Sequence, residues 1–127
     1  MGRFIITRTA AGVCFVLQGE NGRALAHSKR YASLDACKKS IRSLMHYAPC
    51  CLVVDATAGQ GGPNPKIEIT REPKGLYYTV KAANGKDILS QGPFATRKAC
   101  LRAVTLLQKG VLQADAVLAN STRRISF

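Results

Sequence analysis

The chain has 127 residues, an apolar fraction of 46%, and 19 Lys and Arg against 7 Asp and Glu, for a formal net charge of +12. This length and composition are typical of one globular domain with its own core, and they exclude general disorder. Neither a signal peptide after Met1 nor an apolar stretch long enough to cross a bilayer is present. We therefore expect a cytoplasmic protein that does not enter a membrane.

Three strands are predicted at the start of the chain. Residues 3–8 alternate between apolar and polar side chains, and residues 13–17 place Val13, Phe15 and Leu17 on one face. Asn21-Gly22 predicts a type I′ hairpin turn, because both central residues of that turn need positive φ. The turn leads into a third strand at 23–28.

A helix and a fourth strand follow. Ser33 is the expected N-cap, and small and apolar residues then recur at helical spacing. Pro49 marks the helix end, and a short strand is predicted at 52–56. The helical stripe comprises Ala36, Cys37, Ser40, Ile41 and Leu44.

The second half of the chain repeats this pattern. A shift of 63 residues aligns the two halves without a gap from the first strand to the end of the helix. Thr96 is the matching N-cap, Gly110 marks the helix end, and the last strand is predicted at 116–119. The aligned pairs include Ile6 with Ile69, Gly12 with Gly75, Phe15 with Tyr78, Asn21-Gly22 with Asn84-Gly85, Tyr31 with Phe94, Cys37 with Cys100, and Leu44 with Leu107.

Glycine and proline separate the two halves. Residues 59–65 read Gly-Gln-Gly-Gly-Pro-Asn-Pro, which lacks the Gly-Lys-Ser/Thr ending of a phosphate-binding loop, so we interpret them as a linker. The predicted organisation is a first repeat at 1–58, this linker, a second repeat at 66–120 and a basic tail at 121–127, all within one structural domain.

The second half carries the more diagnostic motif. An aromatic strand precedes Asn84-Gly85, and Ile88, Ser90, Phe94 and a helix with a cysteine follow. This pattern resembles the YegP-like family, a domain of unknown function, and the resemblance covers nearly the whole chain except the linker and the tail. It implies an α+β fold of two tandem β-β-β-α-β repeats that form one pseudosymmetric domain. It further implies an antiparallel sheet with both helices on one face and the last strands exchanged between repeats.

The positive charge is the main functional signal. A magnitude of about 2–8 is enough to keep a small domain soluble, so +12 favours a polyanionic partner, although solubility alone remains an alternative. If the helices pack side by side, their basic residues form one surface. The predicted polyanion surface comprises Lys29, Arg30, Lys38, Lys39, Arg42, Arg97, Lys98, Arg102 and Lys109.

Catalytic and metal-binding patterns are absent from the sequence. His27 and His46 fall in different elements, and no nucleophile motif accompanies either of them. The five cysteines lack Cys-x-x-Cys spacing, so we expect reduced thiols and no zinc site. We expect no enzymatic activity and no cofactor.

The sequence therefore predicts a small, basic, non-enzymatic binding module, most concretely one that binds nucleic acid or another polyanion without sequence specificity. The alternative is a module for protein interaction or oligomerisation with no nucleic-acid role. A monomer is favoured over an obligate oligomer, since two repeats already share one core. A small-molecule pocket between the halves is a third possibility.

Overall fold

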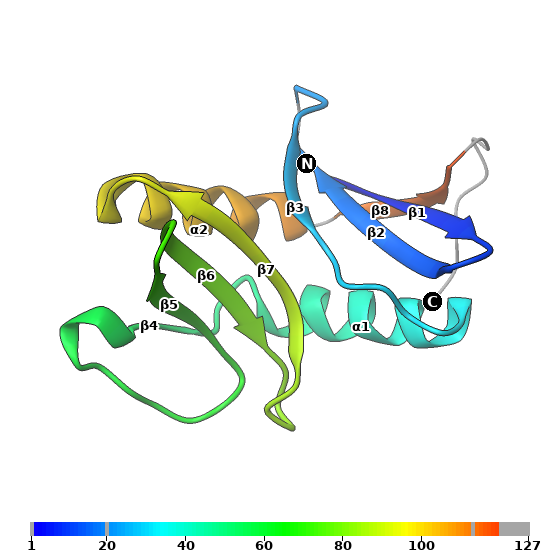
Figure 1. Cartoon of the computed structure of the whole chain (residues 1–127). Coiled ribbons are helices and arrows are strands. Elements are labelled where there is room, and N and C mark those ends of the chain that lie inside the picture. The colour runs from blue at the N-terminus through cyan, green and yellow to red at the C-terminus, as the bar shows by residue number, and fades with distance from the viewer. Residues whose placement is uncertain (1, 20, 113, 120–127) are drawn as a thin grey trace.

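The computed structural model describes residues 2–19, 21–112 and 114–119. Its eight strands and two α-helices follow the same order in each half of the chain (Figure 1). In chain order the elements are β1 (Arg3–Thr9), β2 (Gly12–Gln18), β3 (Ala24–His27), α1 (Leu34–Tyr47), β4 (Leu52–Asp55), the 3-10 helix η1 (Ala56–Ala58), β5 (Lys66–Glu72), β6 (Gly75–Lys81), β7 (Asp87–Phe94), α2 (Arg97–Val111) and β8 (Asp115–Leu118).

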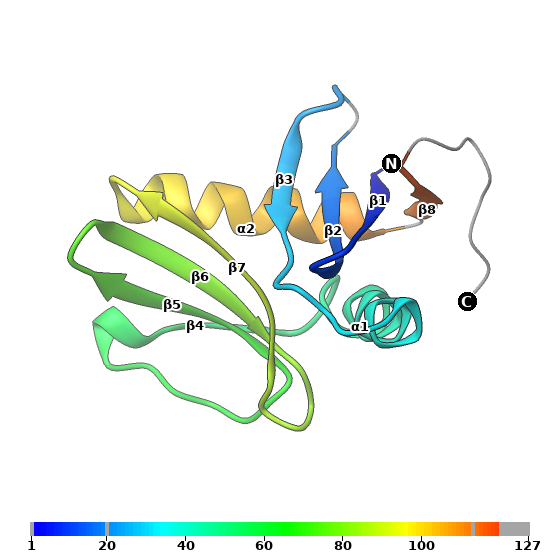
Figure 2. The same cartoon turned by 45° about the vertical axis from the view of Figure 1, so that its right-hand side comes forward.

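The strands form two mixed sheets, in the orders β3-β2-β1-β8 and β4-β5-β6-β7. The prediction of one antiparallel sheet was therefore wrong. Within each sheet the three strands of a meander are antiparallel, but β8 pairs parallel with β1 and β4 pairs parallel with β5. The connection from β4 to β5 runs back along the sheet, so both strands start at the same end, as parallel pairing requires (Figure 2).

Both hairpin turns begin one residue earlier than predicted. In the second half, Gly85 N donates to Ala82 O and Ala82 N donates to Lys86 O, each at 2.9 Å. Gly85, with φ +85°, therefore closes the turn and does not stand at its centre. The type I′ expectation was wrong, and the geometry is that of a three-residue loop whose glycine takes the left-handed position.

The helices begin where the sequence predicts. The side chains of Ser33 and Thr96 accept from the backbone amides of Ala36 and Ala99, each at 3.1 Å, as N-cap oxygens do. Their ends differ from the prediction in one respect: Gly110 lies inside α2, which continues to Val111. Gly110 is buried there, so its small size serves packing and not helix termination.

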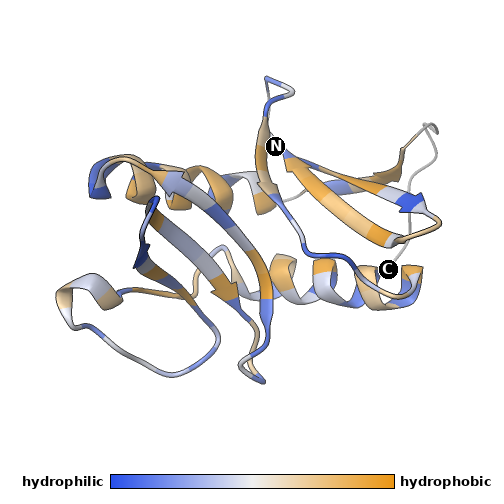
Figure 3. Cartoon of the chain, viewed as in Figure 1, coloured by the Kyte–Doolittle hydropathy of each residue, from blue (hydrophilic) through white to orange (hydrophobic). Residues whose placement is uncertain are grey.

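The buried side chains of both sheets and both helices form one cluster. Apolar residues recur along β2, on β6 and on the inner sides of the helices (Figure 3). α1 contacts β2, whereas α2 contacts β2 and β3 of the first sheet and β6 and β7 of the second. The helices therefore pack on the strands through the stripes predicted from the sequence; Cys37, Ile41, Leu44, Cys100, Val104 and Leu107 are all buried.

The two sheets meet where β3 passes β7. A single antiparallel bridge joins Ser28 to Leu89, and the side chain of Gln91 accepts from the backbone amide of His27 at 3.3 Å. A side-chain amide thus takes the place of a strand partner, and the ladder does not continue into one eight-stranded sheet. Further side-chain hydrogen bonds add to the single backbone bridge at this junction.

Two tyrosine hydroxyls cross the same junction. Tyr31, just after β3, donates to the carbonyl oxygen of Ile88 in β7 at 3.2 Å. Tyr78 in β6 donates to the carbonyl oxygen of Leu25 in β3 at 3.4 Å. Leu25 and Ile88 are aligned positions of the two halves, so each half supplies one donor and one acceptor to the junction.

Candidate functional site

The nine basic residues predicted to form a polyanion surface are on or next to the helices. Lys29 and Arg30 lie between β3 and α1, and the remaining seven are on α1 and α2. Eight are exposed; Lys38 is half-buried. Their placement at the surface follows from the helical period, because the opposite stripe of each helix faces the core.

The structure places eight of these residues in two groups, one on or just before α1 and the other, Arg97, Lys98 and Arg102, in the first half of α2, with Lys109 in the last turn of α2. α1 and α2 approach each other at their C-terminal ends, where Gln108 Nε2 donates to the carbonyl oxygen of Ala48 at 3.0 Å. Their N-terminal ends lie at opposite ends of the molecule (Figures 1 and 2). The side-by-side helices that would merge the charges into one surface are therefore not formed, and a ligand contacting both groups has to be long.

Arg97 differs from the other eight residues because it has a structural role. Its Nε lies 2.7 Å from Asp55 Oδ2, and its Nη2 donates to Thr57 Oγ1 at 2.8 Å. The hydroxyl of Thr57 and the charge of Arg97 together hold the pKa of Asp55 below its ordinary value. This pair fastens the start of α2 to the end of β4, which leaves Arg97 less available to an external anion.

The other carboxylates with partners pair with cations on the strands. Within the described part of the chain the remaining salt bridges join Arg3 to Asp115, Lys66 to Glu68 and Lys81 to Asp87. None of these uses a helix cation. Lys29 is exposed and lies over the ring of Tyr31, with its Nζ 5.6 Å from the centroid.

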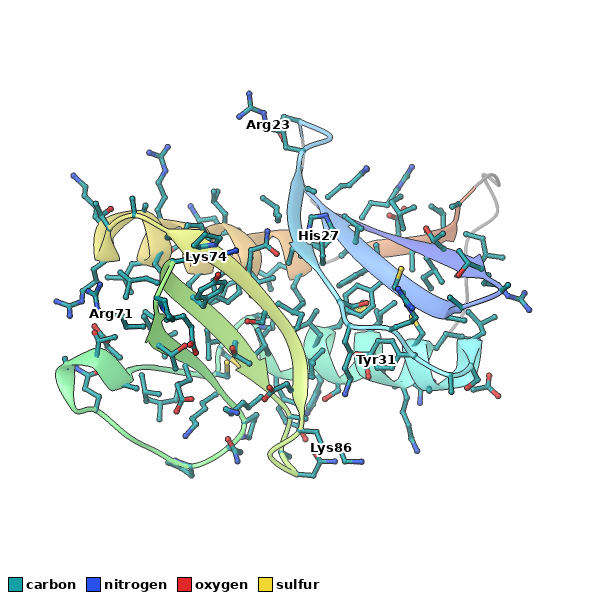
Figure 4. All side chains as sticks on the ribbon, viewed as in Figure 1. Arg23, His27, Tyr31, Arg71, Lys74 and Lys86 are labelled. Atoms are coloured by element: carbon teal, nitrogen blue, oxygen red, sulfur yellow. The ribbon has the colours of Figure 1, made fainter. Side chains whose placement is uncertain are left out.

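The structure adds a basic residue that the sequence reasoning missed. Arg23 projects from the turn between β2 and β3 (Figure 4), and with Arg102 and Lys109 of α2 it lines a groove. These side chains come from segments nearly eighty positions apart, so no local pattern could have grouped them. The sequence indicated only that Arg23 should be exposed, because it follows the turn residues Asn21-Gly22.

The thiols of Cys37 and Cys100 and the ring of Tyr77 are packed against neighbouring residues. Cys37 and Cys100 are buried, and burial raises the pKa of both thiols, that of Cys37 to about 11. Tyr77 of β6 is half-buried against Gly92, where an added Cβ would lie 2.5 Å from Tyr77 Cδ2. Among the described residues no group of three or more His, Cys, Asp or Glu side chains could hold a metal ion, and neither helix is long and apolar enough to span a bilayer.

Part of the chain matches a known family model, and the fold matches two solved structures. Residues 10–55 match the model of a family described as a domain of unknown function, DUF1508. The protein of unknown function yegP from E. coli has the same fold, with a TM-score of 0.71 at 20% identity over 94% of this chain and 96% of that one. A UPF0339 protein from Shewanella oneidensis gives a TM-score of 0.72 at 16% identity over 95% of each chain.

The family-model match over residues 10–55 and the shared fold confirm the resemblance to the YegP-like family, a domain of unknown function. At these identities the solved structures establish the α+β fold and do not assign a ligand. No curated protein matches the chain.

Proposed function

We propose that this protein is a non-enzymatic binding module for polyanions, most concretely nucleic acid bound without sequence specificity. The observation that carries the proposal is the uncompensated charge of the helices. Of the nine predicted basic residues, only Arg97 takes part in a salt bridge between described residues. Phosphates would be bound by charge and counterion release, which needs no particular base sequence.

The separation of the two basic groups favours a long ligand. Lys38, Lys39 and Arg42 lie on α1, and Lys98 and Arg102 lie toward the distant end of α2. A nucleic-acid strand or duplex carries phosphates at regular spacing and can reach both groups, whereas a single phosphate compound reaches one.

The test is fluorescence anisotropy with labelled single-stranded DNA, duplex DNA and RNA between about 50 and 300 mM salt. The variant Lys38→Gln/Lys39→Gln/Arg42→Gln removes the α1 group. We expect weaker binding to all three probes, and a salt slope reduced by up to about 3 because each lost phosphate contact lowers it by about 1.

The matched control is Arg71→Gln/Lys74→Gln/Lys86→Gln, which removes the same charge from exposed positions in the second half of the chain. Figure 4 shows Arg71 and Lys74 away from α1. If both variants weaken nucleic-acid binding equally, binding depends on net charge alone and not on the α1 residues. Absence of binding at the lowest salt would refute the proposal.

A protein-interaction role is the second candidate, and one observation favours it. β4 is an edge strand, and its Leu52 is 46% exposed. Edge strands can pair with an extended segment of another chain. Partner binding that persists at high salt and is lost in Leu52→Lys would support this role over polyanion binding.

We propose further that the two halves are copies of one repeat that exchange their last strands. The support is the gapless shift of 63 residues together with the pairing of β8 with β1 and of β4 with β5. A chain ending at Ala114 should then unfold or aggregate, whereas one ending at Asn120 should keep its circular dichroism. A stable, monomeric chain ending at Ala114 would contradict the exchange. The basic tail predicted at 121–127 lies outside the described residues.

A further inference from the structure

A groove runs between the β2–β3 turn, β7 and α2, where the two sheets and one helix come together. Its volume is about 710 Å³, within the range of pockets that hold small organic ligands. Its lining residues are Gly19, Asn21, Arg23, Ala24, Leu25, Gln91, Phe94, Arg102, Ala103, Leu106, Lys109 and Gly110.

The lining combines an apolar floor with a cationic rim. Leu25 and Phe94 are half-buried, and Leu106 is 44% exposed although it is a large apolar side chain. Arg102 and Lys109 are two helical turns apart on the same side of α2, and Arg23 lines the groove from the β2–β3 turn. No carboxylate is among the described lining residues.

The aligned region of the other half has different chemistry. The 63-residue shift places Tyr47 of α1 opposite Gly110 of α2, and Ser43 opposite Leu106. Gly110 is packed closely enough that a Cβ there would lie 2.8 Å from Leu25 Cδ1. A tyrosine at position 110 would therefore displace Leu25 or fill the groove. The apolar floor is thus a property of the α2 side alone.

We propose that this groove binds a small amphipathic organic anion, a carboxylate or phosphate ester with an apolar group of several carbon atoms. The apolar group lies on Leu25, Phe94 and Leu106, where burial removes it from water. The anionic group lies between Arg102, Lys109 and Arg23, whose charges no described carboxylate of the lining neutralises. The proposal does not depend on nucleic-acid binding.

The first test is titration of the folded full-length chain with 8-anilinonaphthalene-1-sulfonate, an aromatic anion whose fluorescence increases on leaving water. Arg23→Gln/Arg102→Gln removes two rim charges. The control Lys39→Gln/Lys86→Gln removes the two residues at the aligned positions of the other half, so both variants lose the same net charge. Lys86 lies at the far end of the second sheet (Figure 4).

We expect the rim variant to bind the probe about five- to tenfold more weakly, the effect of losing two exposed charge pairs, and the control to change it less than about twofold. Octanoate or octyl phosphate should displace the probe, and the stronger of the two identifies the anionic group. Acetate and octanol, which each lack one half of the chemistry, should not displace it.

Gly110→Tyr should abolish probe binding, and circular dichroism checks that this variant folds. If the variant does not fold, the comparison of the rim variant with its control tests the proposal. Absence of probe binding, or equal weakening by rim and control variants, would overturn the proposal. Displacement by an oligonucleotide but not by octanoate would also overturn it and assign the groove to the polyanion surface. Failure of nucleic-acid binding with intact octanoate displacement would refute only the polyanion function.

Discussion

The hydroxyls of Tyr31 and Tyr78 offer a direct test of how the two sheets are held together. Each donates across the junction to a backbone carbonyl, at 3.2 and 3.4 Å respectively. Replacement by phenylalanine removes one oxygen and leaves the ring in place. The aligned positions already carry Phe94 and Phe15, and each of these rings stacks on a tyrosine of its own half, so the ring itself should be accommodated.

The expected magnitude follows from burial and distance. Tyr31 is 8% exposed and Tyr78 is fully buried, so water does not readily replace the lost donor. A buried hydrogen bond contributes about 0.5–1.5 kcal/mol. We expect Tyr31→Phe to cost about 1 kcal/mol, Tyr78→Phe somewhat less because its contact is longer, and the double variant about 2 kcal/mol if the two bonds act independently.

The assay is urea unfolding followed by far-UV circular dichroism at neutral pH. Tyr77→Phe is the matched control: it makes the same chemical change on the opposite face of β6, and Tyr77 is half-exposed. We expect this control to stay within about 0.5 kcal/mol of wild type. If Tyr31→Phe and Tyr78→Phe destabilise the protein no more than Tyr77→Phe, these hydroxyls do not fasten the junction.

Two further predictions concern the thiols and the helix caps. Burial raises the pKa of Cys37 from 9.0 to about 11, so its contribution to stability, complete below about pH 9, is lost as the pH rises through 11. Unfolding titrations at alkaline pH should show a smaller loss for Cys37→Ala, and iodoacetamide should label exposed Cys50 before Cys37; labelling at equal rates would contradict the buried position. Ser33→Ala and Thr96→Ala should each cost about 1 kcal/mol in urea unfolding, because each leaves a helix amide without its acceptor. An unchanged midpoint for either variant would show that water replaces its cap.

The basic surface and the groove show different limits of sequence reasoning. The exposure of the helix cations could be predicted, because it follows from the spacing of Cys37, Ile41 and Leu44 on the opposite stripe. Their division into two groups could not, since it depends on how α1 and α2 cross the sheets. The pairing of Arg97 with Asp55 and Thr57 likewise could not be predicted, because it depends on β4 lying next to the start of α2.

Local chemistry determined the elements of this protein. Alternation placed the strands, cap residues started the helices, and the YegP-like motif indicated the α+β class, because each signal acts over a few neighbouring residues. The tertiary structure decided that the last strands run parallel and that two sheets form instead of one. It also brought Arg23, Arg102 and Lys109 around one groove. These outcomes depend on contacts between distant segments, and such contacts are set by packing the whole core at once.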